Sequence, residues 1–232
     1  DGTSKLSPYL EYGMISVRKI YSDCIKLHNQ SEGVEKWIDE ILWREFYIYI
    51  SIHFPDSIKY EFQKKYQEFP WKKNNNYLTK WQEGETGYPI IDACMKQLKE
   101  TGWMHNRGRM IVASFLTKDL FIDWREGEKW FMEQLIDGDT ASNVGGWQWT
   151  AGVGVDAAPY FRIFNPVLQS KKYDPKAEFI SKWLPTLRNT PVKYAHEPWL
   201  SENKIYIEQI IDHQISKMET LQTFKSFNNQ NE

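Results

Sequence analysis

The chain has 232 residues and a formal net charge of -2 at pH 7, with 29 Lys and Arg against 31 Asp and Glu. This length suffices for one large domain or two small ones around a sizeable core. The near-neutral charge argues against a globally basic coat for nucleic acid, so any DNA contact has to use a local patch. Aromatic residues make up 16% of the chain, including 11 Trp. Rings in this number suit an aromatic-rich core or stacking on a flat ligand.

Cysteine and histidine usage excludes two further kinds of site. Cys24 and Cys94 stand alone without a CxxC spacing, and the five His show no metal-ligand spacing. We therefore expect a reducing compartment, no disulfide framework and no metal. The chain has no apolar run of membrane length and no signal-peptide pattern, which predicts a cytoplasmic protein that does not enter the membrane.

Helical periodicity and capping signals recur along the chain, with almost no strand pattern. The first helix is predicted to begin with a Ser7 cap and Pro8 and to stop at Gly13, and Ser16 is predicted to cap the second. Further helices are expected at 31–54, 89–101, 106–120, 124–135, 139–150, 178–183 and 203–224, with an irregular loop at 55–76 and a polar tail at 225–232. The apolar residues expected to pack the last helix onto the domain are Ile207, Ile211, Ile215 and Met218. The pattern predicts one all-α domain over residues 1–232.

The stretch from Thr101 to Pro166 concentrates residues that packing alone does not require: Trp, Arg, two acids around a Gly, and a Gly pair. Its motifs, in order, are GWMHNRGRM, DWREGE, LIDGD, GGWQW and DAAPYFRIFNP. Together they closely resemble the flavin-binding domain of the photolyase/cryptochrome family, and most closely its microbial members that repair cyclobutane pyrimidine dimers. The resemblance covers residues 3–199.

The resemblance implies a helical FAD-binding domain that repairs UV-damaged DNA with light and acts as a monomer. In the family an α/β antenna domain precedes this point. None of it lies within the 232 residues, so the chain is either a fragment or naturally short, and no antenna chromophore is expected to bind it. Two alternatives stay open: a cryptochrome-like photosensor without repair, and a helical fragment without cofactor.

The first constellation is the run Thr3, Ser4, Lys5, Leu6 and Ser7. Hydroxyls and free N–H groups at a helix start favour phosphate oxygens, although such a run is ordinarily a simple helix cap. The resemblance assigns these five positions to the pyrophosphate and ribityl region of the flavin cofactor. Lys5 stands where Arg is usual, which keeps the charge and loses the planar fork.

The second constellation lies on one face of the predicted helix 31–54, where spacings of three and four align Trp37, Glu40, Arg44 and Tyr47. Glu40 and Arg44 would ordinarily form a surface ion pair. The resemblance assigns Trp37 to the flavin, and Glu40, Trp43, Arg44 and Tyr47 to the lesion and its strand. The opposite, core-facing side is predicted to be formed by Ile38, Ile41 and Leu42.

The third constellation is at the start of the helix predicted at 106–120. Asn106 faces the same way as Arg109 and Met110, and the plain alternative is an Asn106 cap with an exposed Arg. The resemblance places Asn106 and Met110 at the lesion, where relatives acting on (6-4) photoproducts carry His at both positions. It assigns Arg107 to a DNA phosphate and Arg109 to the flavin site.

The fourth constellation is LIDGDTASNVGGWQW. A buried Asp137 needs a partner, for which Arg109 is expected. The resemblance assigns Asp137, Gly138 and Asp139 to the flavin, and Asn143 to a position beside the central ring, where Asn is typical of repair. A calcium loop and paired glycosidase carboxylates are the competing interpretations, and the rest of either pattern is absent.

The remaining assignments rest on the resemblance alone. Trp147, Trp124 and Trp71 correspond to the family's three-tryptophan electron path, and each is also a plausible core residue. Trp149 corresponds to a second lesion-stacking ring, which would hold the dimer against Trp43. The expected DNA contacts near the end of the motif region are Arg162 and Gln169.

Overall fold

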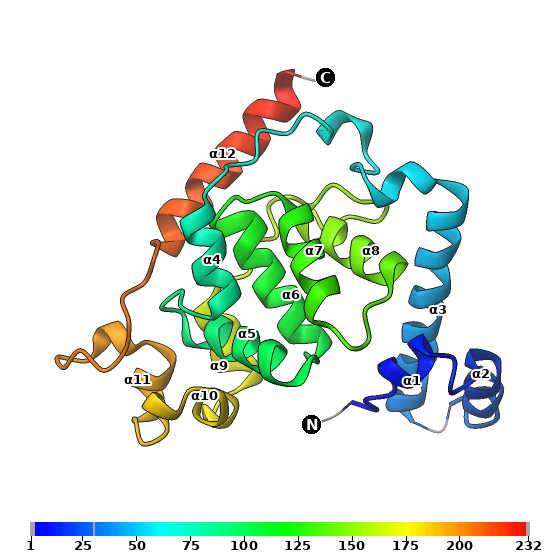
Figure 1. The fold of residues 1–232 in the computed structure, drawn as a ribbon, viewed down its shortest axis with the longest axis horizontal. Helices are drawn as coiled ribbons and strands as arrows, with labels where there is room; N and C mark the ends of the chain where they lie inside the picture. Colours follow the sequence, from blue (N-terminus) through cyan, green and yellow to red (C-terminus); the bar gives the residue numbers. More distant parts are fainter. Residues whose placement is uncertain (1–2, 30, 231–232) are drawn as a thin grey trace.

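The computed structural model describes residues 3–29 and 31–230, and within them the chain is largely helical (Figure 1). The α-helices in chain order are α1 (Ser7–Glu11), α2 (Val17–Lys26), α3 (Glu32–His53), α4 (Asn75–Glu83), α5 (Pro89–Thr101), α6 (Asn106–Ser114), α7 (Trp124–Gln134), α8 (Thr140–Ala151), α9 (Pro166–Tyr173), α10 (Glu178–Trp183), α11 (Val192–His196) and α12 (His213–Gln230). A π-helical turn, Phe115–Asp119, continues α6, and short 3-10 turns lie at Pro55–Ile58, Lys64–Tyr66, Pro185–Leu187 and Pro198–Leu200. The β pairing of the described residues is an isolated bridge between Lys72 and Ile122. The all-α prediction is confirmed.

Most helix starts and stops follow from local chemistry. The Ser16 hydroxyl accepts from Lys19 N at 3.4 Å and begins α2, and Asp123 and Asp139 cap α7 and α8 in the same way. Gly102 ends α5 with φ +66, where a Cβ would also lie 2.7 Å from Ile136 Cγ2. These boundaries were readable from the sequence because each depends on residues within one turn.

The predicted Ser7 cap is wrong. The residue before α1 is Leu6, which provides no side-chain cap. The Ser7 hydroxyl accepts instead from Trp103 Nε1, 3.3 Å away, and this bond ties the N-terminal segment to the end of α5. A long-range partner has replaced the local one.

The predicted helix at 203–224 is wrong at both ends. Residues 203–212 are irregular and are fastened to the start of α5. Tyr206 Oη donates to Asp92 Oδ2 at 2.9 Å, and Ile210 N donates to the Thr86 carbonyl at 3.0 Å. The helix runs from His213 to Gln230, so the expected tail is helical to that point, and residues 231–232 lie outside the described part of the chain. The apolar stripe that we expected to pack is largely exposed, at 44% for Ile207, 55% for Ile215 and 63% for Met218.

Two of the helices, α4 and α9, were not predicted from the sequence. α4 and α9 are each capped by an Asn: Asn74 accepts from Tyr77 N at 3.0 Å, and Asn165 accepts from Leu168 N at 2.9 Å. Helix α11 was also not predicted, and it has no side-chain cap. These helices are short, so their periodicity is weak.

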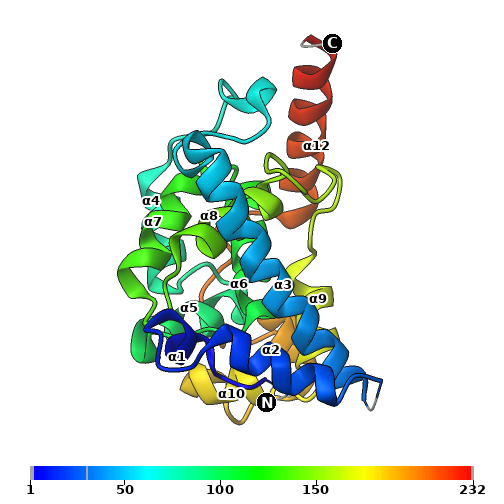
Figure 2. The same cartoon turned by 90° about the vertical axis from the view of Figure 1, so that its right-hand side faces the viewer.

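The core lies among α5, α6, α7 and α8, with α12 on one side and α3 on the other (Figures 1 and 2). Helix α3 crosses α8 closely, because a Cβ at Gly145 would lie 2.2 Å from Tyr47 Cδ1. Of the three residues expected on the core side of α3, Ile38 and Ile41 are buried and Leu42 is 53% exposed. The prediction is therefore wrong for Leu42, which faces solvent.

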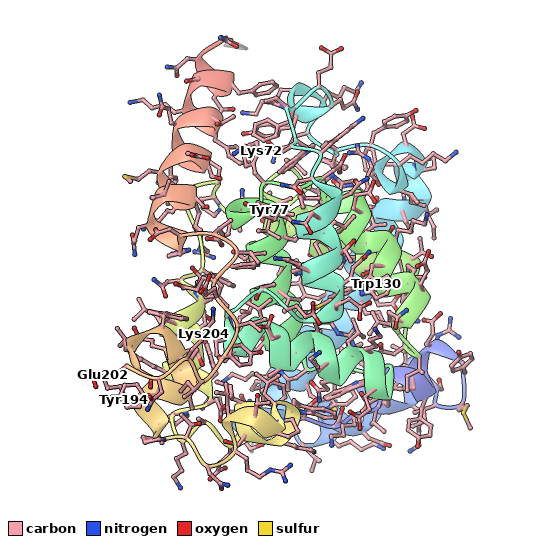
Figure 3. All side chains as sticks on the ribbon, turned by 60° about the vertical axis from the view of Figure 1, so that its left-hand side comes forward. Lys72, Tyr77, Trp130, Tyr194, Glu202 and Lys204 are labelled. Atoms are coloured by element: carbon pink, nitrogen blue, oxygen red, sulfur yellow. The ribbon has the colours of Figure 1, made fainter. Side chains whose placement is uncertain are left out.

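The π-helical turn carries two buried ionisable side chains that hold α8 and α12. Lys118 Nζ donates to the Ala151 carbonyl, the last residue of α8, at 2.7 Å, and burial lowers the pKa of Lys118 to about 7. Thr220 Oγ1 of α12 donates to the Lys118 carbonyl at 2.6 Å, and Asp119 pairs with His213. Further out, Lys72 forms an exposed 2.9 Å ion pair with Glu219 of α12 (Figure 3).

Candidate functional site

An open cleft lies among α6, α7 and α8. Its lining contains many of the residues that the sequence singled out, together with apolar side chains from the core. The lining residues are Asn106, Arg109, Met110, Ala113, Phe131, Leu135, Asp137, Asp139, Ser142, Asn143, Gly146, Trp147 and Thr150. Apolar walls with a few placed polar groups are typical of a small-molecule site.

A buried ion pair forms one wall of this cleft. Arg109 Nη2 donates to both oxygens of Asp137, at 2.9 and 2.7 Å, and Arg109 Nε donates to the Met104 carbonyl at 2.8 Å. The Asp137 side chain is 0% exposed and that of Arg109 is 27% exposed. The expected pairing is present, and it leaves part of the guanidinium free to meet a ligand.

Asn143 enters the same cleft with its orientation fixed. Its Nδ2 donates to the Glu128 carbonyl and to Glu128 Oε1, both at 3.0 Å, so the amide carbonyl is the group left to accept from a ligand. Burial raises the pKa of the Glu128 carboxyl, and the bond from Asn143 partly offsets this. The role of Glu128 was not predicted, although it ends the motif DWREGE, because the contact joins residues on two different helices.

Asp139 has a structural role as well as a place in the cleft lining. Its Oδ1 accepts from Ser142 N at 2.6 Å and caps α8, which leaves the other oxygen for a ligand. Glu11 of α1 lies near enough that desolvation and then repulsion from Asp139 raise its pKa. Gly138 does not line the cleft, and a Cβ there would lie 3.3 Å from Met132 Sδ.

The N-terminal run lies exposed beside Trp103. Ser4 Oγ accepts from Leu6 N at 3.4 Å, and Lys5 Nζ lies 5.6 Å from the centre of the Trp103 ring. Lys5 has a φ of 55, an uncommon conformation for a residue with a Cβ. Thr3, Ser4, Lys5 and Ser7 are exposed and Leu6 is half-buried.

A second, shallow cleft lies on the other side of α8, between that helix and α3. Tyr47 and Trp149 line it, whereas Asn106 and Met110 line the first cleft. Trp43 reaches this region through Tyr47, with the two rings stacked 6.0 Å apart. The residues expected at the lesion are therefore divided between the two faces of α8.

The other expected residues of α3 lie at or near its surface. Arg44 Nη1 is 3.6 Å from Glu45 Oε1, so its ion-pair partner is Glu45 and not Glu40. Partial desolvation, followed by repulsion from Asp39, raises the pKa of Glu40. Trp37 is half-buried.

Three tryptophans expected in an electron path lie in the aromatic core. Trp147 and Trp124 are 2% and 0% exposed. Trp147 rests on Gly127 of α7, where a Cβ would lie 2.1 Å from Trp147 Cη2, and Gly127 is one turn from Trp124. Trp71 is half-buried, 5.4 Å from the Phe121 ring. Separate segments thus place all three in one cluster.

The expected DNA contacts vary in exposure. Arg162 is exposed, while Gln169 has its Oε1 buried without a hydrogen-bond partner. Arg107 lies over the Tyr173 ring of α9, 4.5 Å from its centre. The cap of α6 is His105, which accepts from Arg107 N at 3.0 Å, so the Asn106 amide is not needed as a cap.

The first cleft fits a flat ring system with polar edges. Phe131, Leu135 and Ala113 supply apolar walls, while the Arg109 guanidinium and the Asn143 carbonyl supply a donor and an acceptor. Gly146 opens onto free space, since a Cβ there would meet nothing within 4 Å. Among the described residues no group of three or more His, Cys, Asp or Glu is placed to hold a metal ion. No helix of the described segments has the length and apolar character that a membrane crossing requires.

Comparison with known proteins agrees with this site. The family described as FAD binding domain of DNA photolyase matches residues 37–226. The deoxyribodipyrimidine photo-lyases of Vibrio cholerae and Escherichia coli are 47% and 48% identical, each over 97% of this chain and 50% of the relative. The chain therefore spans about half the length of these relatives.

Solved structures give the same result. A class III photolyase from Agrobacterium tumefaciens superposes with a TM-score of 0.92 at 40% identity, covering 98% of this chain and 50% of that one. A cryptochrome from Synechocystis sp. PCC6803 superposes with a TM-score of 0.89 at 36% identity, over 95% of this chain and 48% of that one. Since the family match, the sequence identity and the cleft agree, the chain belongs to the family of the FAD binding domain of DNA photolyase.

Proposed function

We propose that the chain binds FAD in the α6–α8 cleft and takes part in the light-driven repair of cyclobutane pyrimidine dimers in UV-damaged DNA. The observation that carries this proposal is the pair of fixed polar groups, Arg109–Asp137 and Asn143–Glu128, facing one ring-sized cleft. The relatives of Vibrio cholerae and Escherichia coli are named deoxyribodipyrimidine photo-lyase, which is a repair activity.

In this proposal the protein positions the cofactor and the lesion, and the cofactor performs the bond chemistry. When bound, reduced FAD supplies the light-excited electron that splits the dimer and takes the electron back afterwards. Asp137 holds Arg109 toward the ring edge, and the Asn143 carbonyl accepts a hydrogen bond without bringing a negative charge to the ring. The residues of the N-terminal run, 3–7, would bind the pyrophosphate and ribityl region, since hydroxyl and amide donors suit an anion.

The lesion would be extruded from the duplex, as light-dependent repair of a stacked base requires, and a damaged pair costs less to extrude. Asn106 and Met110 would contact it from α6, and Glu40 would donate to or accept from a thymine edge. Trp43 and Trp149 would flank it, which requires the lesion to contact both clefts, since Asn106 and Met110 line the first and Trp149 lines the second. Because Asn106 and Met110 replace two His, we propose the cyclobutane dimer and not the (6-4) photoproduct as substrate.

DNA binding would use few phosphate contacts. The cationic groups available are Arg44, Arg107 and Arg162, and the chain as a whole carries a net charge of -2. Each phosphate neutralised on duplex DNA contributes a slope of about -0.9 in log affinity against log salt concentration. We also propose a single domain, a monomer and a cytoplasmic location, with no antenna chromophore on this chain.

A cryptochrome-like photosensor is the second candidate, because the Synechocystis cryptochrome has the same fold at 36% identity. Such a protein would share the cofactor and lack repair. Asn143, Glu40, Trp43 and Asn106 favour repair, since all four stand at positions that the resemblance links to the lesion or to repair.

Two measurements test these proposals in order. An absorption spectrum of the purified chain should show flavin bands, and a colourless protein would support the cofactor-free fragment. Illumination of the flavin-reduced protein with blue or near-ultraviolet light should then reverse cyclobutane dimers in an oligonucleotide. Repair of a (6-4) substrate alone would overturn the substrate, and flavin bands without any repair would favour the photosensor.

A further inference from the structure

Trp124 has a hydrogen-bond partner that the sequence analysis did not consider. Its side chain is 0% exposed, and its Nε1–H donates to Glu61 Oε1 at 3.2 Å. Glu61 is itself only 2% exposed, although it comes from the irregular segment between α3 and α4. A buried carboxylate therefore meets the indole N–H directly.

Arg125 fixes this carboxylate in place. Its Nη1 and Nη2 donate to the two Glu61 oxygens at 2.9 and 2.5 Å, and its guanidinium lies 4.8 Å from the centre of the Trp124 ring. Nη1 also donates to Asp123 Oδ1 at 3.0 Å. Two carboxylates and one guanidinium thus surround Trp124, and the carboxylate of Glu61 is the group bonded to its N–H.

The neighbouring tryptophans have different surroundings. Trp147 contacts the rings of Phe131 and Trp81, with centres 5.0 and 6.0 Å away, and these carry no charge. Trp71 Nε1 is buried without a hydrogen-bond partner. An indole that loses an electron becomes positively charged and a stronger N–H donor, so a carboxylate on that N–H stabilises the oxidised state, most of all where water is excluded.

We propose that Glu61 stabilises the oxidised state of Trp124 relative to that of Trp147, so that the positive charge moves from Trp147 to Trp124 when the flavin is photoreduced. The inference rests on the proposed function, because it requires the electron path Trp147, Trp124 and Trp71. One electron passes from Trp124 to oxidised Trp147, which has given its own electron to the light-excited oxidised flavin. No covalent bond breaks, and the Nε1 proton stays in the hydrogen bond to Glu61. Glu61 is a positioning and charge-stabilising residue and does not itself change oxidation state.

The first experiment measures the contact without using the flavin reaction. The Trp124 indole N–H resonance, assigned with Trp124→Phe, should move upfield in Glu61→Gln, because the charged acceptor becomes a neutral one. Glu219→Gln is the matched control, since it removes a carboxylate from the exposed pair with Lys72, the residue that follows Trp71. It should leave this resonance in place. An unmoved resonance in Glu61→Gln would overturn the inference.

The second experiment measures the lifetime of the oxidised tryptophan after a flash, in the flavin-bound chain carrying Trp71→Phe, so that the path ends at Trp124. Glu61→Gln should shorten this lifetime about tenfold, and Glu219→Gln should not, because an exposed charge is screened. Glu61→Asp keeps the negative charge, and it provides a second test of the inference if the Gln variant does not fold. It should retain most of the lifetime, whereas an equal loss in both variants would show a structural role only and overturn the inference.

Trp124→Phe separates this inference from the proposed function. Slowed photoreduction in Trp124→Phe with an unchanged lifetime in Glu61→Gln would leave the electron path standing and reject the role of Glu61. Unchanged photoreduction in Trp124→Phe would reject the path and the inference together. A chain without bound flavin would reject the proposed function first.

Discussion

The two faces of α8 differ in how their residues are held. On the α6–α7 side, Asp137 is bonded to Arg109 and Asn143 to Glu128, and each bond joins residues on different elements of the core. On the α3 side and in the N-terminal run, Trp43 is 42% exposed and Glu40 is also exposed. The polar groups assigned to the flavin ring are thus held by buried partners before a ligand arrives, whereas Trp43 and Glu40, which are assigned to the lesion, lie on an exposed face.

This difference fits the two ligands. A cofactor that stays bound gains from a site whose polar groups are already oriented, since little order has to be imposed on binding. DNA has to enter and leave, so the residues that contact it have to be exposed to solvent while no DNA is bound. The comparison can be tested because substitutions on the two sides should differ in their effect on stability before any ligand is added.

The largest effect on stability is expected at the ion pair between Arg109 and Asp137. Asp137→Ala leaves Arg109 partly buried without its partner, which should lower the free energy of unfolding by ~3 to 5 kcal/mol and reduce the flavin content of the purified chain. Urea unfolding and the flavin-to-protein absorbance ratio measure the two losses. Asp156→Ala, an exposed carboxylate in the second cleft, is the control and should change neither. Equal flavin content in Asp137→Ala and parent would remove Asp137 from the site.

The buried Lys118, which donates to the last residue of α8, predicts that the stability of the chain depends on pH. The pKa of Lys118 is lowered to about 7 in the folded chain, whereas an unfolded lysine titrates near 10.4. Between about pH 7 and pH 10 the unfolded chain binds this proton and the folded chain does not, so the free energy of unfolding rises with pH, by up to about 1.4 kcal/mol per pH unit.

Lys118→Met removes this dependence while keeping a long apolar side chain. The free energy of unfolding of the variant, relative to that of the parent, should be highest at neutral pH. It should fall as the pH is raised to about 9, because only the parent gains stability. Urea unfolding of both chains across this range gives the difference. Lys72→Met, which removes an exposed lysine, is the control. A constant difference between Lys118→Met and parent across the range would mean that Lys118 is not neutral in the fold.

Asn143→Asp is expected to have an intermediate effect. It replaces the amide donor with a second carboxylate against Glu128, whose pKa burial already raises. The variant should lose ~1 to 3 kcal/mol of stability at neutral pH. The folded variant then binds a proton that the unfolded chain releases, so its stability relative to the parent should recover as the pH falls toward about 5. Thermal unfolding from neutral to acid pH measures this, and a loss that grows on acidification would contradict it.

Much of the cleft was predictable, for a physical reason. Asn106, Arg109 and Met110 share one face of a helix, and Asp139 caps the next, so local spacing already fixes their directions. The motif order then supplied what spacing alone did not, namely that Asp137 and Arg109 meet. The helices that carry these residues were predicted within a few residues of their observed bounds.

The failures share a different cause. Glu61 meets Trp124, and Glu128 meets Asn143, because segments distant in sequence pack together. No local pattern marks Glu61, and the motif that contains Glu128 does not show which residue it contacts. The stripe Ile207, Ile211, Ile215 and Met218 has helical spacing, yet its first half is pulled out of the helix by bonds to the start of α5. Tertiary contacts decided these positions, and a single sequence does not display them.

The smallest effect on stability is expected on the exposed face. Glu40 has an exposed side chain on α3, so Glu40→Ala should change the free energy of unfolding by less than about 0.5 kcal/mol. Repair should nevertheless fall, on the order of tenfold, because the carboxyl group is proposed to contact the lesion as charge develops on it.

The partial desolvation that raises the pKa of Glu40 should deepen when DNA covers it, which favours the protonated, hydrogen-bond-donating form. Glu32→Ala, which removes an exposed carboxylate paired with Lys36 at the start of α3, is the matched control for repair and for DNA binding. Loss of stability in Glu40→Ala comparable to that of Asp137→Ala would break the contrast between the two faces, and undiminished repair would remove Glu40 from the lesion site.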